Sequence, residues 1–297
     1  RQMCIRDSGY GAMDDVDAGT TVGGSAENIF IGKDAGGGTW SNNAASHYNI
    51  GVGNYTMDAV MNGALGNVAT GHNALGAITS GDYNVGFGID AGLALTGGDR
   101  NVAIGASALQ GTSNDITGVV AVGHSAAGSG NLTTGANYSV AIGKEALTAL
   151  TSGANNVAIG YQAGDVITTS GNNTMVGKSA MGSTLATGCN YNVAIGTEAL
   201  GGSWTGSAST HNTAVGTFAM DAAMDGALRN VAMGYGSMGS LTTGDDNTAI
   251  GYLSLLSCAT GANNTCIGSL SGDAITGAND CVSLGYFSLS AAATQTG

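Results

Sequence analysis

The pentapeptide NVAIG occurs three times in this 297-residue chain, at Asn101–Gly105, Asn156–Gly160 and Asn192–Gly196. Repetition of so short a segment indicates an internal repeat, because a catalytic motif is needed only once. When its last glycine is taken as an anchor, the chain contains fifteen copies, spaced 17 to 21 residues apart. The anchors are Gly32, Gly53, Gly71, Gly88, Gly105, Gly123, Gly143, Gly160, Gly177, Gly196, Gly216, Gly234, Gly251, Gly268 and Gly285.

The residues before each anchor form strict columns. The fourth residue before the anchor is Asn in twelve copies, with Val119, Ser139 and Cys281 as the exceptions. The third is always Val, Ile or Thr, the one directly before the anchor is apolar in every copy except that with Thr70, and a small residue usually stands between them. β-Branched residues at alternate positions predict a short strand with one face buried. We expect the Val and Ile columns to form the core and the Asn column to form a ladder of amide hydrogen bonds.

After the anchor the pattern changes. Ala is the third residue after it in ten copies, Leu or Met commonly follows, and another apolar residue often stands at the seventh position. This spacing favours a short amphipathic helical turn, as in EALTALTSG at Glu145–Gly153, and a bent second strand is the alternative. Each coil closes with a Thr/Ser-Gly-x-Asn stretch such as TSGANN, which is typical of turns.

These columns together predict a parallel β-solenoid, an elongated rod of stacked coils of about 17–21 residues. Each coil contributes the strand N-[VIT]-A-[IV]-G and a helical turn or second strand, and stacking pairs every strand with its neighbours above and below. Residues 28–297 are expected to form a fifteen-coil solenoid, a fragment of a longer fibre, and residues 9–27 an irregular N-terminal coil. The stretch RQMCIRDS at 1–8 resembles a translated sequencing-adapter junction, with a short natural tail as the alternative.

Composition excludes several classes of function. The formal net charge is −13 and there are only seven Lys and Arg residues, so the chain lacks the basic surface that nucleic-acid binding requires. Apolar runs of about 18 residues are absent, which predicts no membrane insertion. The cysteines contain no C-x-x-C pair and are expected to be buried free thiols. The four histidines, His47, His72, His124 and His211, are scattered and give little support to a zinc site.

The repeat resembles those of known fibre proteins. NYSVAIGKEAL at Asn137–Leu147 and the NVAIG copies look like the SVAIG-type repeats in head domains of trimeric autotransporter adhesins, and the repeat is also similar to that of phage tail-fibre-like proteins. The resemblance covers residues 28–297. It implies an extracellular β-solenoid on a virion or cell surface, often homotrimeric, that holds or presents a binding surface. The coil is longer here than in the adhesin heads, so trimerisation is a hypothesis beside end-to-end stacking of subunits.

Sequence motifs for catalysis are absent: the chain has no G-x-S-x-G elbow, no H-E-x-x-H and no phosphate-binding GxxxxGK[ST], so we expect no enzyme, and a glycan-active enzyme is the remote alternative. Calcium is the better ligand candidate, because five aspartates lie in the closing turns, with solvated turn residues as the alternative. They are Asp82, Asp99, Asp245, Asp246 and Asp280. Ice binding is a further alternative, although Thr falls mainly in the turns rather than in a strand column.

Two features interrupt the repeat and suggest contact sites. Trp40 and Trp204, the only tryptophans, lie in loop outgrowths, where they would contact a cell-surface glycan or receptor or would instead fill the loop's own small core. Five N-x-S/T sequons are candidate glycosylation sites, with chance in an Asn- and Thr-rich repeat as the alternative. They are Asn54, Asn131, Asn137, Asn172 and Asn263. The sequence therefore predicts a structural or adhesive extracellular fibre whose binding, if any, uses the loops.

Overall fold

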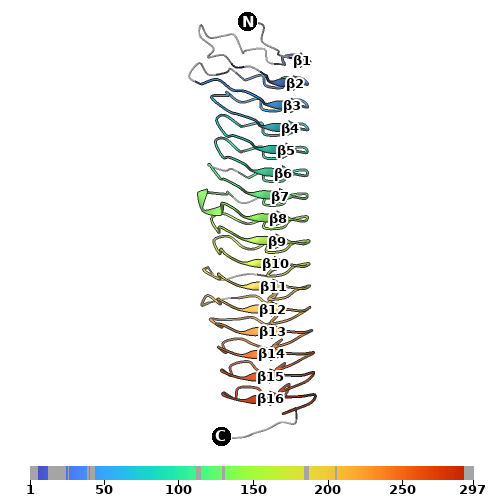
Figure 1. Ribbon diagram of the computed structural model, residues 1–297, viewed down its shortest axis with the longest axis vertical. Coiled ribbons are helices and arrows are strands. Elements are labelled where there is room, and N and C mark those ends of the chain that lie inside the picture. Colours follow the sequence, from blue (N-terminus) through green and yellow to red (C-terminus); the bar gives the residue numbers. More distant parts are fainter. Residues whose placement is uncertain are drawn as a thin grey trace. The chain divides into compact units, whose positions relative to one another are not determined.

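The computed structural model describes residues 6–12, 25, 27–38, 40, 44–111, 115–128, 131–183, 187–204 and 206–290. The chain divides into two compact units, Arg1–Ser152 and Gly153–Gly297. Each unit is a parallel β-solenoid whose strands stack one coil after another in chain order (Figure 1). The predicted fold class is therefore confirmed. Cys4 and the rest of residues 1–5 lie outside the described residues, whereas Arg6–Ser8 form a strand.

Every strand is three residues long and pairs in parallel with the next strand of its unit. The first unit contains β1 (Arg6–Ser8), β2 (Ile29–Ile31), β3 (Ile50–Val52), β4 (Val68–Thr70), β5 (Val85–Phe87), β6 (Val102–Ile104), β7 (Val120–Val122), the 3₁₀-helix η1 (Thr134–Ala136) and β8 (Val140–Ile142). The second contains β9 (Val157–Ile159), β10 (Thr174–Val176), β11 (Val193–Ile195), β12 (Thr213–Val215), β13 (Val231–Met233), β14 (Thr248–Ile250), β15 (Thr265–Ile267) and β16 (Val282–Leu284). The register aligns like positions, as in Val68↔Val85 and Val85↔Val102.

The strand faces are reversed relative to the expectation that Val and Ile form the core. In β9 the middle residue, Ala158, is fully buried, whereas Ile159 is 38% exposed and Val157 is intermediate. The same alternation holds from β2 to β16: the middle residue is buried and the two flanking residues point outward. The prediction of a half-buried strand is confirmed, but its choice of face is wrong.

The narrow interior of the coil explains this reversal. At Gly86, the middle of β5, an added Cβ would lie 2.9 Å from Cγ of Leu75, so little room exists beside the turn residues. Next to the large middle residue Phe30 of β2, which is fully buried, the paired residue of β3 is Gly51. An added Cβ on Gly51 would lie 2.6 Å from the Phe30 ring. Protein interiors are close-packed with little free space. The column of small middle residues therefore faces inward, and the β-branched columns on either side face outward.

The rest of the core comes from the turn after each anchor, as the sequence predicts. In the coil after β8, Ala146, Leu147 and Leu150 are all fully buried. These are the third, fourth and seventh residues after Gly143, the positions where apolar residues recur along the chain.

This turn is neither the expected amphipathic helix nor a second strand. Residues 144–149 form consecutive turns, and the second and fourth residues after the anchor are left-handed, with φ of +61° at Glu145 and +49° at Leu147. Alternating handedness prevents the i→i−4 hydrogen bonds of an α-helix. The peptide groups bond to neighbouring coils instead: the N–H of Glu145 donates to the carbonyl of His124, and the carbonyl of Ala146 accepts from the N–H of Ala127.

The Asn column forms the predicted amide ladder. Asn84 Nδ2 donates to Asn67 Oδ1 at 3.1 Å and to the Gly98 carbonyl at 2.6 Å. Its Oδ1 accepts from the backbone N–H of Asn101 at 2.9 Å and from Asn101 Nδ2 at 3.0 Å. Asn84 is fully buried, so these bonds satisfy its amide without water. Part of the hydrogen-bonding pattern remains where the ladder residue is not Asn, since the backbone N–H of Val119 still donates to Asn101 Oδ1.

The anchor glycine is required by its backbone and by its neighbour. Gly160 has φ of +141°, and an added Cβ would lie 2.5 Å from the carbonyl oxygen of Gly177, the anchor of the next coil. Any other residue would therefore separate the coils at this corner.

Candidate functional site

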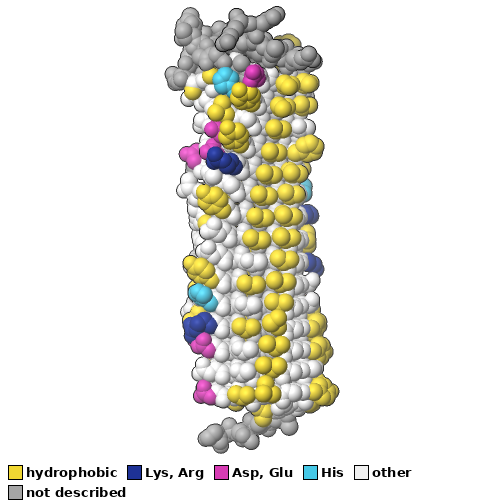
Figure 2. Space-filling view, in the orientation of Figure 1, with side chains coloured by type: hydrophobic (Ala, Val, Ile, Leu, Met, Phe, Trp, Pro, Cys, Tyr) yellow, Lys and Arg dark blue, Asp and Glu magenta, His cyan; other side chains and the backbone are white. Residues whose placement is uncertain are grey.

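The outward strand residues form a regular apolar surface, which we call the strand face: the first and third residues of strands β2 to β16. The third residues are the more exposed, with Ile104 at 38%, Ile195 at 39% and Ile267 at 40%. Figure 2 shows apolar side chains in columns over the strands of each unit. In the second unit four first positions are Thr: Thr174, Thr213, Thr248 and Thr265. Contiguous exposed apolar area of this kind marks an interaction surface in a soluble protein.

A second, mostly polar row runs along the corner that precedes the strands. This edge row consists of the fifth residue before each anchor, and its members adopt positive φ, as in Tyr83 (+57°) and Arg229 (+56°). Neighbouring members pair across coils. The ring centroids of Tyr191 and His211 lie 5.0 Å apart, and the Arg100 guanidinium lies 5.9 Å from the Tyr83 ring centroid.

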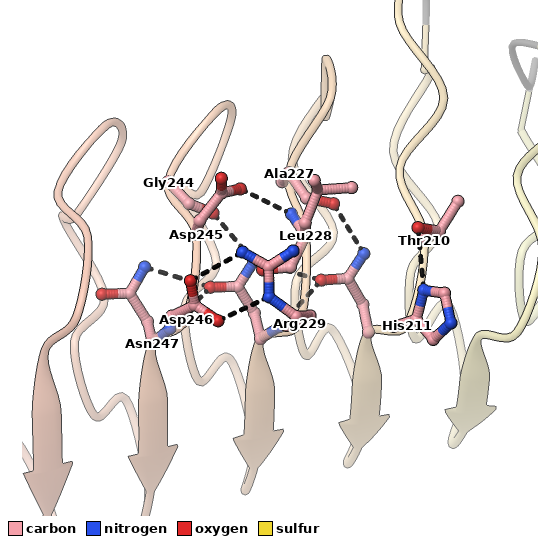
Figure 3. Close-up of polar contacts among 11 residues, drawn as sticks. Thr210, His211, Ala227, Leu228, Arg229, Gly244, Asp245, Asp246 and Asn247 are labelled. Carbon is pink, nitrogen blue, oxygen red and sulfur yellow. Dashed lines mark hydrogen bonds and ion pairs between the residues drawn. The ribbon is translucent and has the colours of Figure 1, made fainter.

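The most polar part of the edge row lies around Arg229 (Figure 3). The guanidinium donates from Nε and a terminal nitrogen to the two carboxylate oxygens of Asp246, both at 2.7 Å. This bidentate bond lowers the pKa of Asp246 and raises that of Arg229. Because both side chains are exposed, this ion pair contributes little to the free energy of unfolding.

The aspartates proposed for calcium are engaged by protein groups. Oδ1 of Asp82 accepts from the backbone N–H of Leu65 at 2.9 Å, and Oδ1 of Asp245 accepts from that of Leu228 at 2.8 Å. Asp99 likewise accepts from the N–H of Asp82, and Asp280 accepts from Asn263 Nδ2. Together with the Asp246 ion pair, these bonds make the turn carboxylates into links between coils.

No group of three or more His, Cys, Asp or Glu side chains in the described part of the chain is placed to hold a metal ion. His47 contacts the ring of Tyr48 and His72 that of Tyr55, while His211 stacks on Tyr191. The histidines are thus distributed over different coils.

The cysteines described are free thiols, as expected. Cys189, Cys258 and Cys266 are buried, and Cys281 is partly exposed. Burial raises the pKa of the Cys266 thiol to about 11, with the nearby Cys258 and Cys281 thiols adding to the effect. A thiol that stays protonated is a poor nucleophile, so the three buried cysteines act as small core residues.

Both tryptophans are buried and are not exposed contact residues as they stand. Trp40 is 3% exposed; its Nε1–H donates to the Gly36 carbonyl at 2.9 Å, and its ring meets Phe30 edge to face at 5.9 Å. Trp204 is fully buried, and its Nε1–H has no hydrogen-bond partner within the described residues. Of the two interpretations of the tryptophans, the structure supports the loop core.

The sequon asparagines differ in accessibility. Four are exposed: Asn54, Asn131, Asn172 and Asn263. Asn137 is partly buried, and its Oδ1 accepts from the backbone N–H of Thr117 at 2.8 Å. Asn172 and Asn263 both belong to the edge row, whereas Asn137 lies one position earlier in its coil. Glycosylation of these residues stays a prediction.

Sequence reasoning missed the strand face because β-branched residues are the usual core of a sheet. The signal that identifies it is the middle strand position, which is Ala, Gly, Ser or Cys in most copies. A column restricted by size is the one that faces a narrow interior, so the unrestricted columns on either side must face outward.

No helix within the described ranges is long and apolar enough to cross a membrane. Comparisons of the chain with protein-family models, with curated proteins and with solved structures found no match.

Proposed function

We propose that this protein is a structural subunit of an extracellular fibre and that copies of it associate through the strand face. The observation that carries the proposal is the regular outward placement of Val, Ile and Thr on strands β2 to β16, although Ile and Val are among the residue types most often buried. Each third-position Ile is more than a third exposed, so contact with a second copy would remove its apolar surface from water. The resulting stabilisation would recur along the stack of coils.

The resemblance to adhesin-head and tail-fibre repeats supports the same function. A surface whose contacts repeat with every coil binds a second copy over its full length, so that small contributions accumulate. Homotrimers satisfy this arrangement without leaving a strand face exposed, because three copies close a ring. End-to-end stacking would leave the strand face uncovered. We therefore place side-by-side association first.

The test uses two lysine substitutions on the strand face, Ile159→Lys with Ile195→Lys. Lysine keeps exposed positions soluble but introduces charge into the apolar contact, so sedimentation velocity should show an oligomer for the natural chain and a monomer for the variant. Thr169→Lys with Thr276→Lys is the matched control, because it adds the same charge at exposed turn residues of the same unit. A natural chain that remains monomeric at high concentration would contradict the proposal.

Ice binding is a second candidate, favoured by the four Thr residues on the strand face of the second unit. Thr248 and Thr265 are direct neighbours on β14 and β15, whereas Val193 and Val231 alternate with Thr174 and Thr213. The whole row of first positions repeats at the parallel-strand spacing of about 4.8 Å, which is the regularity that a crystalline ligand would need. Inhibition of ice recrystallisation by the natural chain and by the Thr169→Lys with Thr276→Lys control would support this function, because both keep the strand face intact. A fibre subunit should show none.

A further inference from the structure

We infer that the second unit carries a binding platform for a neutral, β-1,4-linked polysaccharide, formed by the aromatic patch: Phe218, Tyr235, Tyr252, Tyr286 and Phe287. The inference rests on the proposed adhesive fibre and names the ligand class that such a fibre would bind. The aromatic patch occupies the first and second positions after the anchor glycines. This corner of the coil is distinct from the strand face and from the edge row.

The composition of this corner changes along the chain. Up to Glu198 the corner contains charged and polar residues, among them Lys144, Lys178 and Glu198 itself. From Thr217 to Phe287 every residue at these two positions is uncharged, and five of them are aromatic. The whole chain contains only 10 Tyr and 4 Phe, so this is a local concentration rather than a general property of the repeat.

The aromatic rings form two contact groups along the stack, Phe218–Tyr235–Tyr252 and Tyr286–Phe287, separated by the coil that has Ser269 and Leu270 at this corner. The ring centroids of Tyr235 and Tyr252 lie 5.6 Å apart with an 18° angle between the planes, and those of Phe218 and Tyr235 lie 5.7 Å apart. An added Cβ on Gly236 would lie 2.6 Å from Cδ2 of Leu253, so glycine at 236 makes room for this side chain of the next coil at the same corner.

The rings remain available to a ligand. Tyr235 is 48% exposed, Tyr252 is 52% exposed and Tyr286 is 75% exposed. Their hydroxyls make no hydrogen bond to described residues, so each ring presents an apolar surface with a polar tip that can donate or accept. This combination suits a pyranose, whose C–H groups pack on an aromatic ring while its equatorial hydroxyls bond at the rim.

Spacing and charge select the polysaccharide. Phe218, Tyr235 and Tyr252 lie in three successive coils. They therefore follow the parallel-strand spacing of about 4.8 Å, which is close to the length of one sugar in an extended β-1,4 chain. Such chains are flat and straight, whereas α-1,4 chains curl away from a straight row. The second unit contains eight Asp and Glu but only two Lys and Arg, which disfavours anionic polymers.

The test is isothermal titration calorimetry of the full chain with cellohexaose and chitohexaose, and with maltohexaose as the α-1,4 control. We expect binding of at least one β-1,4 oligosaccharide and none of maltohexaose. Tyr235→Ala with Tyr252→Ala should lower the affinity roughly tenfold or more, since each ring contact contributes about 0.5–1.5 kcal/mol. Tyr235→Phe with Tyr252→Phe should retain most of the affinity, because the rings remain.

Tyr161→Ala is the matched control, because Tyr161 occupies the same position of its coil and is 43% exposed but lies outside the patch. It should bind like the natural chain. Absence of binding to both β-1,4 oligosaccharides, equal binding of maltohexaose, or unchanged affinity in the double alanine variant would each overturn the inference. Sedimentation velocity of that variant separates the two proposals, since loss of the platform should leave self-association intact.

Discussion

At the scale of the residue, each ladder asparagine stabilises the fold through hydrogen bonds that link its coil to the neighbouring coils. The amide of Asn84 makes four hydrogen bonds, which join three consecutive coils. An apolar residue of the same size would remove all four bonds, and the Gly98 carbonyl and the backbone N–H of Asn101 would lose these partners. The column is therefore kept for its hydrogen-bonding pattern, and the twelve asparagines could be identified from the sequence alone for that reason.

Asn84→Ala is expected to destabilise the protein strongly. Two donors of Asn101 lose their acceptor and the Gly98 carbonyl loses its donor, and each unpaired buried group costs about 1–3 kcal/mol. Urea unfolding should therefore show a loss on the order of 3 kcal/mol or more. Asn155→Gly is the control: it removes an exposed asparagine next to the ladder residue Asn156, and glycine accepts its φ of +57°. A small effect at Asn84 would mean that the ladder is not structural.

The two buried tryptophans allow a paired test of hydrogen bonding. Trp40→Phe removes the bond to the Gly36 carbonyl, whereas Trp204→Phe removes a buried N–H that lacks a described partner. Both lose similar volume, so Trp40→Phe should be the more destabilising by about 1–2 kcal/mol. Thermal unfolding of the two variants measures the difference. The opposite order would indicate that Trp204 Nε1–H is bonded in solution.

At the scale of the element, the coil shows which parts of the structure could be read from the sequence. The strands, the ladder and the anchor glycines were predictable, because each depends on a local property that a column displays. The strand face and the turn after the anchor were not. The direction in which Ile159 points depends on the space inside the coil, and the turn containing Leu147 depends on hydrogen bonds to other coils, so neither follows from periodicity along one chain.

Deletion of one complete coil should preserve the fold. Removing the 17 residues Tyr235–Gly251 joins Gly234 to Tyr252, and β13 then lies next to β15 with every column in register. Because each coil contacts only its neighbours, the protein should stay folded and lose only a few degrees of thermal stability. Circular dichroism and thermal melting measure this.

The control deletion, Tyr235–Thr243, removes about half a coil and places turn residues opposite strand residues. It should prevent cooperative folding of the second unit. If both deletions behaved alike, register between columns would not be what holds the coils together.

At the scale of the whole molecule, net charge and apolar surface have opposite effects on the proposed association of copies. The chain has a formal net charge of −13, so copies repel one another at neutral pH. In the proposed assembly the strand face would contribute attraction that does not depend on charge, because its side chains, mostly Val, Ile and Thr, are uncharged. Strands β2 to β16 contain no charged residue, and charged side chains such as Arg229 and Asp246 lie in the edge row instead. Association thus depends on how far the repulsion is screened.

Raising the salt concentration should therefore strengthen self-association. The Debye length falls from about 10 Å at 0.1 M to about 3 Å at 1 M ionic strength, which removes the repulsion between acidic copies and leaves the apolar contact unchanged. Sedimentation velocity at both salt concentrations should show a shift from smaller to larger species, and Ile159→Lys with Ile195→Lys should stay monomeric at both. Dissociation with added salt would instead show that ion pairs hold the copies together, which the uncharged strand face does not provide.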